Sequence, residues 1–200
     1  MKTLIRTANT ALAGILLALA GCAHQIRIVP DPSELAPGAS AGRIDRKVGY
    51  YISPENRARV VESPAGGGDR VSYAPYADLE PGLSRVLQNV FSQVSAVNDI
   101  KDTGFLRDNG ISLVFVPTIT TTSSSRNGFF WPPTDFSVSL ECLALDAQGL
   151  EVWRKSVAAD GGLIAVSVIL KEHGLAGRRA AENALKKLQT ELIEAPELRR

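Results

Sequence analysis

Alternating apolar and polar positions predict several β-strands along the chain. Val48, Tyr50 and Ile52 share one face of a short segment, which is the period-two pattern of a half-buried strand. Three consecutive glycines at 66–68 separate two further segments and provide the backbone freedom that a loop between antiparallel strands needs. We expect strands over residues 47–53, 59–62, 70–73, 111–122, 134–146 and 150–159.

Two other segments carry apolar residues at helical spacing. The first begins at Asp78, which can cap a helix, and it has Pro81 in its first turn, where proline is tolerated. The second runs from Leu175 to Glu194. The apolar stripe of the first helix consists of Leu79, Leu83, Val86, Leu87, Val90, Phe91 and Val94.

The order of these elements indicates the fold class. Strands come first, then a helix, then a meander of three strands, and then the last helix. The turn Asp146–Gly149 joins the second and third strands of the meander. This order predicts an α+β fold in which two helices pack on a mainly antiparallel sheet. A length of 200 residues fits one compact domain plus a targeting segment, so we assign the fold to a single domain over residues 45–196. No internal repeat is visible.

The N-terminus has a different pattern. Residues 11–20 are apolar or glycine, and Lys2 and Arg6 precede them. A run of about ten residues is too short to cross a hydrocarbon core roughly 30 Å thick. Basic residues followed by a short apolar run are typical of a cleaved signal peptide.

Prolines and glycines are frequent between the signal peptide and the first expected strand. Such a composition resists regular structure, so we expect residues 22–44 to be a flexible tether. Some twenty flexible residues reach about 25 Å. Ile26 and Ile28 leave an alternative open, because they could pair as a short edge strand.

Charge and composition restrict the partners. The chain is 44% hydrophobic and 22% charged, which is ordinary for a globular domain. Removal of Lys2 and Arg6 with the signal peptide lowers the net charge from +1 to about −1. A nearly neutral chain without a dense basic stretch lacks the clustered cations that phosphate binding requires. We therefore expect no nucleic-acid partner.

No catalytic motif is visible in the sequence. The two histidines, His24 and His173, have no second ligand at helical spacing, so we expect no metal site and no cofactor. Neither a nucleophile elbow nor a serine–lysine motif occurs. We expect a protein without catalytic activity, although a site assembled from residues distant in sequence remains an alternative.

Two apolar segments outside the expected elements need an explanation. Phe129, Phe130 and Trp131, followed by two prolines, lie between the two longest expected strands. They either fold back over an open end of the core or form a protruding tip that contacts a partner or a membrane. Residues 163–170 are apolar without a clear period, so they are either buried or part of an interface.

The two cysteines have different surroundings. Cys142 lies in an alternating apolar run, and we expect it to be a small buried hydrophobe. An exposed nucleophile or an intermolecular disulfide is the alternative. Cys22 follows Leu19, Ala20 and Gly21 at the end of the signal peptide, and this stretch resembles the lipobox of bacterial lipoproteins.

The lipobox resemblance implies a covalent membrane anchor. It implies a thioether between Cys22 and diacylglycerol, cleavage after Gly21, and acylation of the new amino group. Two or three acyl chains give stable anchoring. Residue 23 is Ala rather than the Asp that resembles an inner-membrane retention signal, so the periplasmic face of the outer membrane is the expected location, with the inner membrane as the alternative.

The domain itself resembles small periplasmic lipoproteins of the YajG type, whose fold is related to the N-terminal domains of CsgG-type and PelC-type export lipoproteins. The likeness lies in the lipobox, the strand Val48–Ile52, the stretch Val71–Pro75 before the first helix and the turn Asp146–Gly149. It covers most of residues 45–193. Nothing matches the membrane-spanning strands of the CsgG pore, so the resemblance does not imply pore formation.

These observations lead to one expected function and one alternative. We expect a lipid-anchored accessory protein that assists cell-envelope assembly or export by binding an envelope protein, with self-association as a further expectation. The alternative is a carrier or chaperone for a lipid or polysaccharide, held in a groove between sheet and helices.

Overall fold

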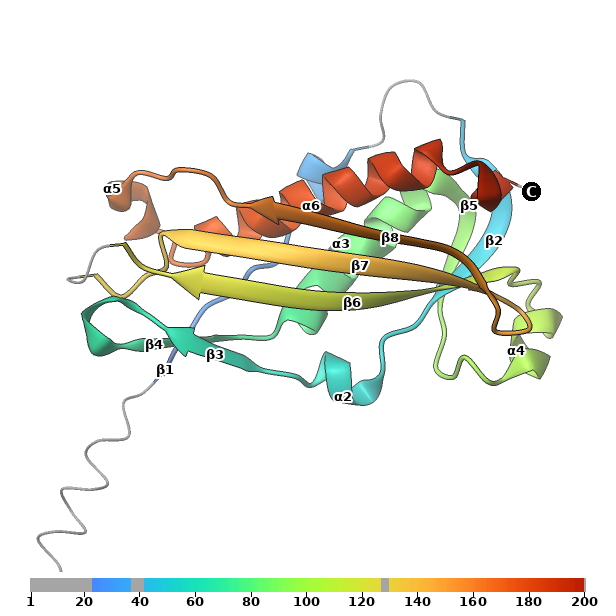
Figure 1. Cartoon of the computed structure of the whole chain (residues 1–200), viewed down its shortest axis with the longest axis horizontal. Helices are drawn as coiled ribbons and strands as arrows, with labels where there is room; N and C mark the ends of the chain where they lie inside the picture. The colour runs from blue at the N-terminus through green and yellow to red at the C-terminus, as the bar shows by residue number, and fades with distance from the viewer. Residues whose placement is uncertain (1–22, 37–41, 127–129, 200) are drawn as a thin grey trace, which may run out of the picture.

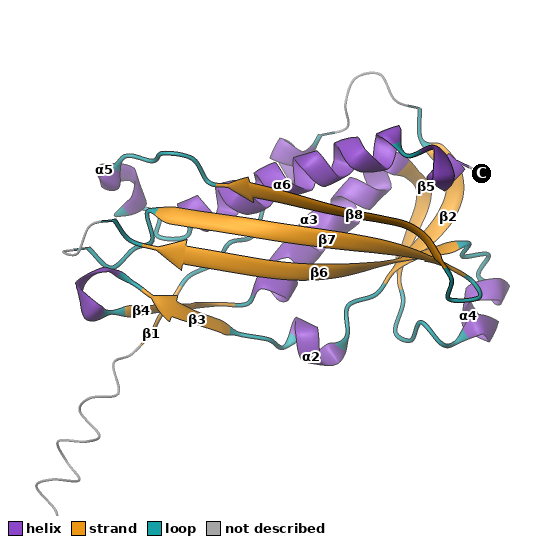
Figure 2. Cartoon of the chain, in the orientation of Figure 1, coloured by secondary structure: helices purple, strands orange, loops and turns teal. Residues whose placement is uncertain are grey.

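The computed structural model describes residues 23–36, 42–126 and 130–199. Over these residues the chain has an α+β fold with two β-sheets, as the element order predicted (Figures 1 and 2). The strands are β1 Ala23–Gln25, β2 Ile44–Tyr50, β3 Val61–Pro64, β4 Arg70–Tyr73, β5 Phe91–Ala96, β6 Leu113–Ser124, β7 Asp135–Asp146 and β8 Glu151–Asp160. The α-helices are α2 Pro54–Arg57, α3 Pro75–Val90, α4 Thr103–Asp108, α5 Val166–Ile169 and α6 Leu175–Glu194, and short 3₁₀ turns cover Pro32–Leu35, Gly66–Gly68 and Pro196–Arg199.

The larger sheet has the strand order β5-β2-β6-β7-β8 and is mixed. The predicted meander β6-β7-β8 is antiparallel, but β2 pairs in parallel with both β5 and β6. The prediction of a mainly antiparallel sheet missed β5 because it placed Phe91 and Val94 on the preceding helix. Helix α3 in fact ends at Val90. Phe91 and Val94 lie on β5, where a separation of three residues places their side chains on opposite faces of the strand, so their helical spacing does not indicate a helix here.

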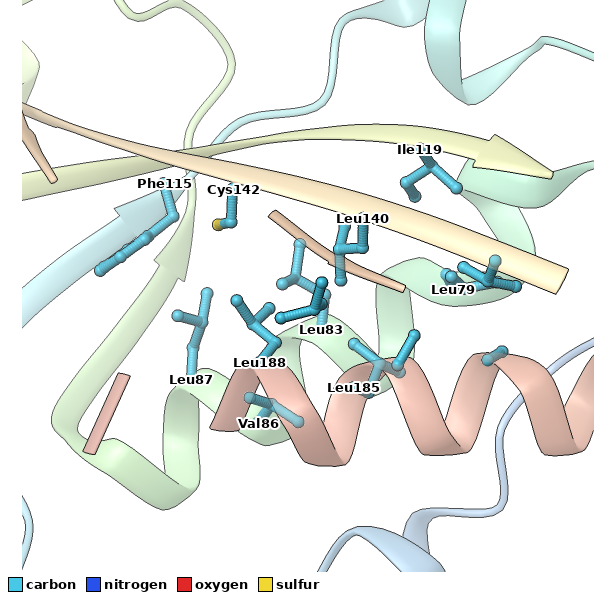
Figure 3. Close-up of a cluster of buried hydrophobic side chains, with 14 of the residues drawn as sticks. Leu79, Leu83, Val86, Leu87, Phe115, Ile119, Leu140, Cys142, Leu185 and Leu188 are labelled. Carbon is cyan, nitrogen blue, oxygen red and sulfur yellow. The ribbon is translucent and has the colours of Figure 1, made fainter. Parts of the chain in front are cut away.

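Helices α3 and α6 pack on one face of this sheet, as predicted (Figure 2). Figure 3 shows the core between them, where Leu83 and Leu87 of α3 and Leu188 of α6 lie under the sheet. Cys142 of β7 is completely buried there, and loss of solvation raises the pKa of its thiol to about 12. The prediction that Cys142 is a buried hydrophobe is confirmed.

The N-terminal segment is part of the folded domain. β1 pairs in parallel with β4 in the smaller sheet β1-β4-β3, and Ile26, Ile28 and Leu35 are buried in the core. The prediction of a flexible tether over residues 22–44 is therefore wrong for residues 23–36, and the domain begins well before residue 45. Prolines disfavour regular structure in this segment, but burial of the apolar side chains at 26, 28 and 35 stabilises an ordered conformation.

Two buried carboxylates hold this segment between the helices. The backbone N–H of Ile28 donates to Asp78 Oδ2 at 3.1 Å, and the N–H of Asp31 donates to Glu182 Oε1 at 2.9 Å. Gly177 on α6 makes the close approach possible, since a Cβ there would lie 2.2 Å from Cγ2 of Ile28. The prediction that Asp78 caps α3 is wrong: the helix begins at Pro75, and the carboxylate binds the N-terminal segment instead.

We predict that Asp78→Ala lowers the free energy of unfolding by about 2 kcal/mol, because it leaves a buried N–H without an acceptor. Urea denaturation measures this loss, and hydrogen exchange at the Ile28 amide should become faster. Asp108→Ala is the control, since Asp108 is exposed and forms only a surface ion pair with Arg107; its change should stay within about 0.5 kcal/mol. Equal losses in the two variants would show that the Asp78 contact does not hold the segment.

Candidate functional site

Two of the predicted site residues, Phe130 and Trp131, are among the described residues. Leu19, Ala20, Gly21, Cys22 and Phe129 lie outside the described residues. Their neighbours Ala23 and Phe130 are described. Ala23 opens β1, and Phe130 lies in the connection between β6 and β7 at the same end of the molecule (Figure 1).

Trp131 lies between the two histidines of the chain. Its ring stacks on the ring of His24 with centroids 4.0 Å apart and an interplanar angle of 16°. The ring of His173 meets it edge-on, with centroids 4.4 Å apart. Trp131 also packs against the hydrophobic core and is partly buried. For this residue the alternative in which the aromatic segment folds back on the domain is the correct one.

The connection between β6 and β7 is held at its base by polar contacts. The N–H of Arg126 donates to Thr134 Oγ1 at 2.9 Å, and the Arg126 guanidinium pairs with Asp135 at 2.5 Å. Pro132 and Pro133 are buried, so they belong to the packed part of the connection rather than to a stiffened tip. Phe130 is 38% exposed and is the described aromatic residue of this segment that remains available for contact.

The apolar segment 163–170 lies at this end too, and its side chains divide between the inside and the outside. Ile169 is buried and Ile164 packs against the core. Leu163, Val166, Val168 and Leu170 are exposed, with Leu163 at 85%. Both alternatives for this segment therefore hold in part, because α5 buries Ile169 and exposes Val166 and Val168.

Two hollows lie beside these segments and both open widely to solvent. The first, of about 410 Å³, is lined by hydroxyl and charged groups that include Ser123, Arg126 and Asp160. The second, of about 520 Å³, is lined by residues that include Arg27 and His173. Both hollows are lined by polar and apolar groups together, and the first also includes Phe136 and Leu163. Neither is the enclosed apolar cavity that suits an acyl chain.

The described residues contain no group of three or more His, Cys, Asp or Glu side chains that could hold a metal ion. His24 Nε2 lies 3.3 Å from Asp69 Oδ2, and His173 Nε2 lies 3.1 Å from the carbonyl oxygen of Leu170. Within the described part of the chain, no helix is long and apolar enough to cross a membrane.

Sequence reasoning did not foresee the contacts between His24, Trp131 and His173. These residues come from the N-terminal strand, the β6–β7 connection and the segment before α6, so no local spacing relates them. The one available signal was that a histidine stands two positions after Cys22, in the stretch that we interpreted as a tether.

We predict that Trp131→Ala lowers the free energy of unfolding by about 2 kcal/mol, because packing and two ring contacts are lost. For a domain of this size this corresponds to a decrease of about 4–8 °C in Tm. Phe130→Ala is the matched control, and its effect should stay within about 0.5 kcal/mol because the side chain is exposed. Calorimetry measures both, and a larger loss for Phe130→Ala would contradict the assignment.

Comparison with known proteins concerns the fold. No protein-family model matches the chain, and no curated protein matches its sequence. Among solved structures it is similar to a Xanthomonas campestris protein of the DUF330 family, with 11% identity, a TM-score of 0.46, and 86% of this chain and 93% of that chain covered.

Two further solved structures show a comparable likeness. The PelC dodecamer from Paraburkholderia phytofirmans has 13% identity and a TM-score of 0.45, with 80% of this chain and 95% of that chain covered. A neuraminyllactose-binding hemagglutinin homologue from Helicobacter pylori has 10% identity and a TM-score of 0.41, with 82% and 95% covered. The structural neighbours thus include DUF330-like and PelC-like proteins, and at these identities the likeness extends to the fold alone.

Proposed function

We propose that this protein is a lipid-anchored accessory protein at the periplasmic face of the outer membrane. In this proposal it resembles the YajG-type lipoproteins and acts by binding another envelope protein during assembly or export, without catalysing a reaction. Self-association is part of the proposal, and the PelC protein of Paraburkholderia phytofirmans was solved as a dodecamer.

The observation that carries the proposal is the position of Cys22. It follows Leu19, Ala20 and Gly21 at the end of an apolar run of signal-peptide length, which is where lipid modification requires a cysteine. Cys142 cannot compete for this chemistry, because its thiol is buried and its pKa is raised to about 12. Cys22 is therefore the one thiol suited to carry the anchor.

We predict that Cys22→Ser leaves the chain as an uncleaved precursor, because a hydroxyl cannot form the thioether that precedes cleavage. Metabolic labelling with palmitate and intact-mass measurement read this directly. Cys142→Ser is the control and should be processed and labelled as the wild type is. Labelled protein of mature size from Cys22→Ser would overturn the anchor.

The bare face of the large sheet supports the binding role. Helices α3 and α6 cover one face of this sheet (Figure 2). On the other face Val114, near the start of β6, packs with Leu106 of α4, and the rest of β6 from Thr118 onward, together with β7 and β8, carries exposed side chains. The exposed side chains of this face are mostly hydroxyl-bearing and include Thr120, Ser139 and Ser156. A broad open face that is not needed for the core is a surface on which a partner can be accommodated.

We predict that a photo-reactive residue at Thr120 gives discrete protein adducts in cells, because it would lie within the contact. The same residue at Arg179, on the exposed side of α6, is the matched control and should give weaker and less discrete products. Mass spectrometry of the adducts identifies the partner. Absence of protein adducts from both positions would contradict a protein-binding role, and adducts of this chain alone would assign the contact to self-association.

A further inference from the structure

Exposed apolar side chains are concentrated at one end of the domain. Among the described residues, eight large hydrophobic side chains are exposed, and Val60, Phe105 and Leu150 are scattered over other parts of the surface. The remaining five come from α5, its flanking residues and the β6–β7 connection, and we call them the apolar end: Phe130, Leu163, Val166, Val168 and Leu170. Figure 1 shows α5 and the β6–β7 connection at the end opposite to α4. A concentration of this kind requires an explanation, whereas isolated exposed apolar residues do not.

A short series of contacts joins the apolar end to the start of β1. His24 stacks on Trp131, Trp131 meets His173, and the His173 ring contacts the carbonyl group of Leu170. Phe130 is the neighbour of Trp131 in the chain, and Ala23 is the neighbour of His24. The Cα atom of Cys22 is about 3.8 Å from that of Ala23 by covalent geometry alone.

Pairing in β1 prevents this junction from moving away from the domain. Ala23, His24 and Gln25 pair with Arg70, Val71 and Ser72 of β4, and the Ile26 N–H donates to Ser72 O at 2.9 Å. A lipid on Cys22 would therefore be separated from the paired strand by a single peptide bond. Any membrane that takes up this lipid lies against the end of the domain where β1 begins.

We propose that the apolar end is a membrane-contact surface that inserts shallowly into the lipid interface beside the anchor. The proposal rests on the proposed lipid modification of Cys22. In this arrangement α5 and Phe130 face the lipid, and the end of the domain that carries α4 points away from the membrane. The eight residues 163–170 are too short to span a bilayer, so the contact is confined to the interface.

The chemistry of the apolar end favours lipid over a charged surface. Three arginines near it are paired with acids: Arg126 with Asp135, Arg178 with Glu172, and Arg70 with Glu62. Lys171, which follows Leu170, is an exposed basic side chain at the edge of this surface. Aromatic and aliphatic side chains partition well at a membrane interface. An anchor holds the surface at high effective concentration, so a weak contact of this kind is sufficient.

The size of the apolar end argues against a second copy of the chain as its occupant. Four of its five side chains are only 37–43% exposed, and Leu163 alone is exposed more fully. A stable interface between proteins takes roughly 20–30 residues on each side. Contact with a bilayer does not require an interface of this size, because lipids are mobile and pack around individual apolar side chains.

The test uses the chain from residue 22 onward, which retains every core residue, since these run from Ile26 to Leu198. It is coupled through the Cys22 thiol to a maleimide phospholipid in phosphatidylethanolamine and phosphatidylglycerol vesicles. Cys142 does not react, because it is buried and its thiol stays protonated. The chemical coupling makes this experiment independent of lipid modification in cells, so failure of the anchor and failure of the contact are distinguishable.

Tryptophan is introduced at Leu163 or Val168, and Leu150→Trp is the matched control because Leu150 is 66% exposed at the β7–β8 turn. The emission added at 163 and 168 should shift to the blue and lose about half or more of its intensity with brominated lipids, since the indole would lie at the interface. The emission added at 150 should be unchanged by the vesicles.

Two results would overturn the proposal. One is equal quenching at 150, 163 and 168, which would mean that no end of the domain is preferred. The other is a blue shift at 163 and 168 in uncoupled protein without vesicles, together with a doubled mass by sedimentation, which would assign the apolar end to a second copy.

Discussion

The position of the N-terminal segment between α3 and α6 is the constraint on which the rest of the structure depends. Asp78 accepts from the Ile28 backbone, and Glu182 accepts from the Asp31 backbone, so each helix supplies one buried carboxylate. Gly177 allows the side chain of Ile28 to approach α6, and the side chains of Ile26, Ile28 and Leu35 complete the core. A buried carboxylate is costly unless it is hydrogen-bonded, so the segment and the helices stabilise one another.

Because the N-terminal segment is packed into the domain, a lipid anchor at Cys22 would restrict the orientation of the domain as well as its distance from the membrane. A flexible tether would let the domain turn freely at some distance from the membrane, whereas a strand paired from Ala23 onward transmits the position of the anchor to the whole domain. The orientation of the bare β6-β7-β8 face then follows from the anchor, because the sheet and the N-terminal segment share one core. Under the proposed lipid modification of Cys22, membrane attachment and presentation of the sheet face would be coupled through the core that the N-terminal segment and the sheet share.

Trp131 connects the N-terminal strand to the exposed apolar end of the domain. It contacts His24 of β1 and also His173, which precedes α6. It therefore links β1 to the start of the last helix, at the end where Phe130 and residues of α5 are exposed. An aromatic segment between long strands therefore divides its residues between structure and contact. Trp131 packs against the domain, and the neighbouring Phe130 remains exposed and available for contact with a membrane or a partner.

The sequence by itself determined the elements whose pattern is local: the last helix at Leu175–Glu194, the β6-β7-β8 meander, the glycine loop between β3 and β4, and the burial of Cys142. Only the tertiary structure decided the parallel pairing of β2 with β5 and β6, the packing of residues 23–36, the role of Asp78, and the contacts of Trp131. The physical reason is that periodicity reports which face of an element is buried, but not what buries it. Ile26 and Ile28 look the same in an extended tether and in a core, and the partner that distinguishes the two lies some fifty residues away at Asp78.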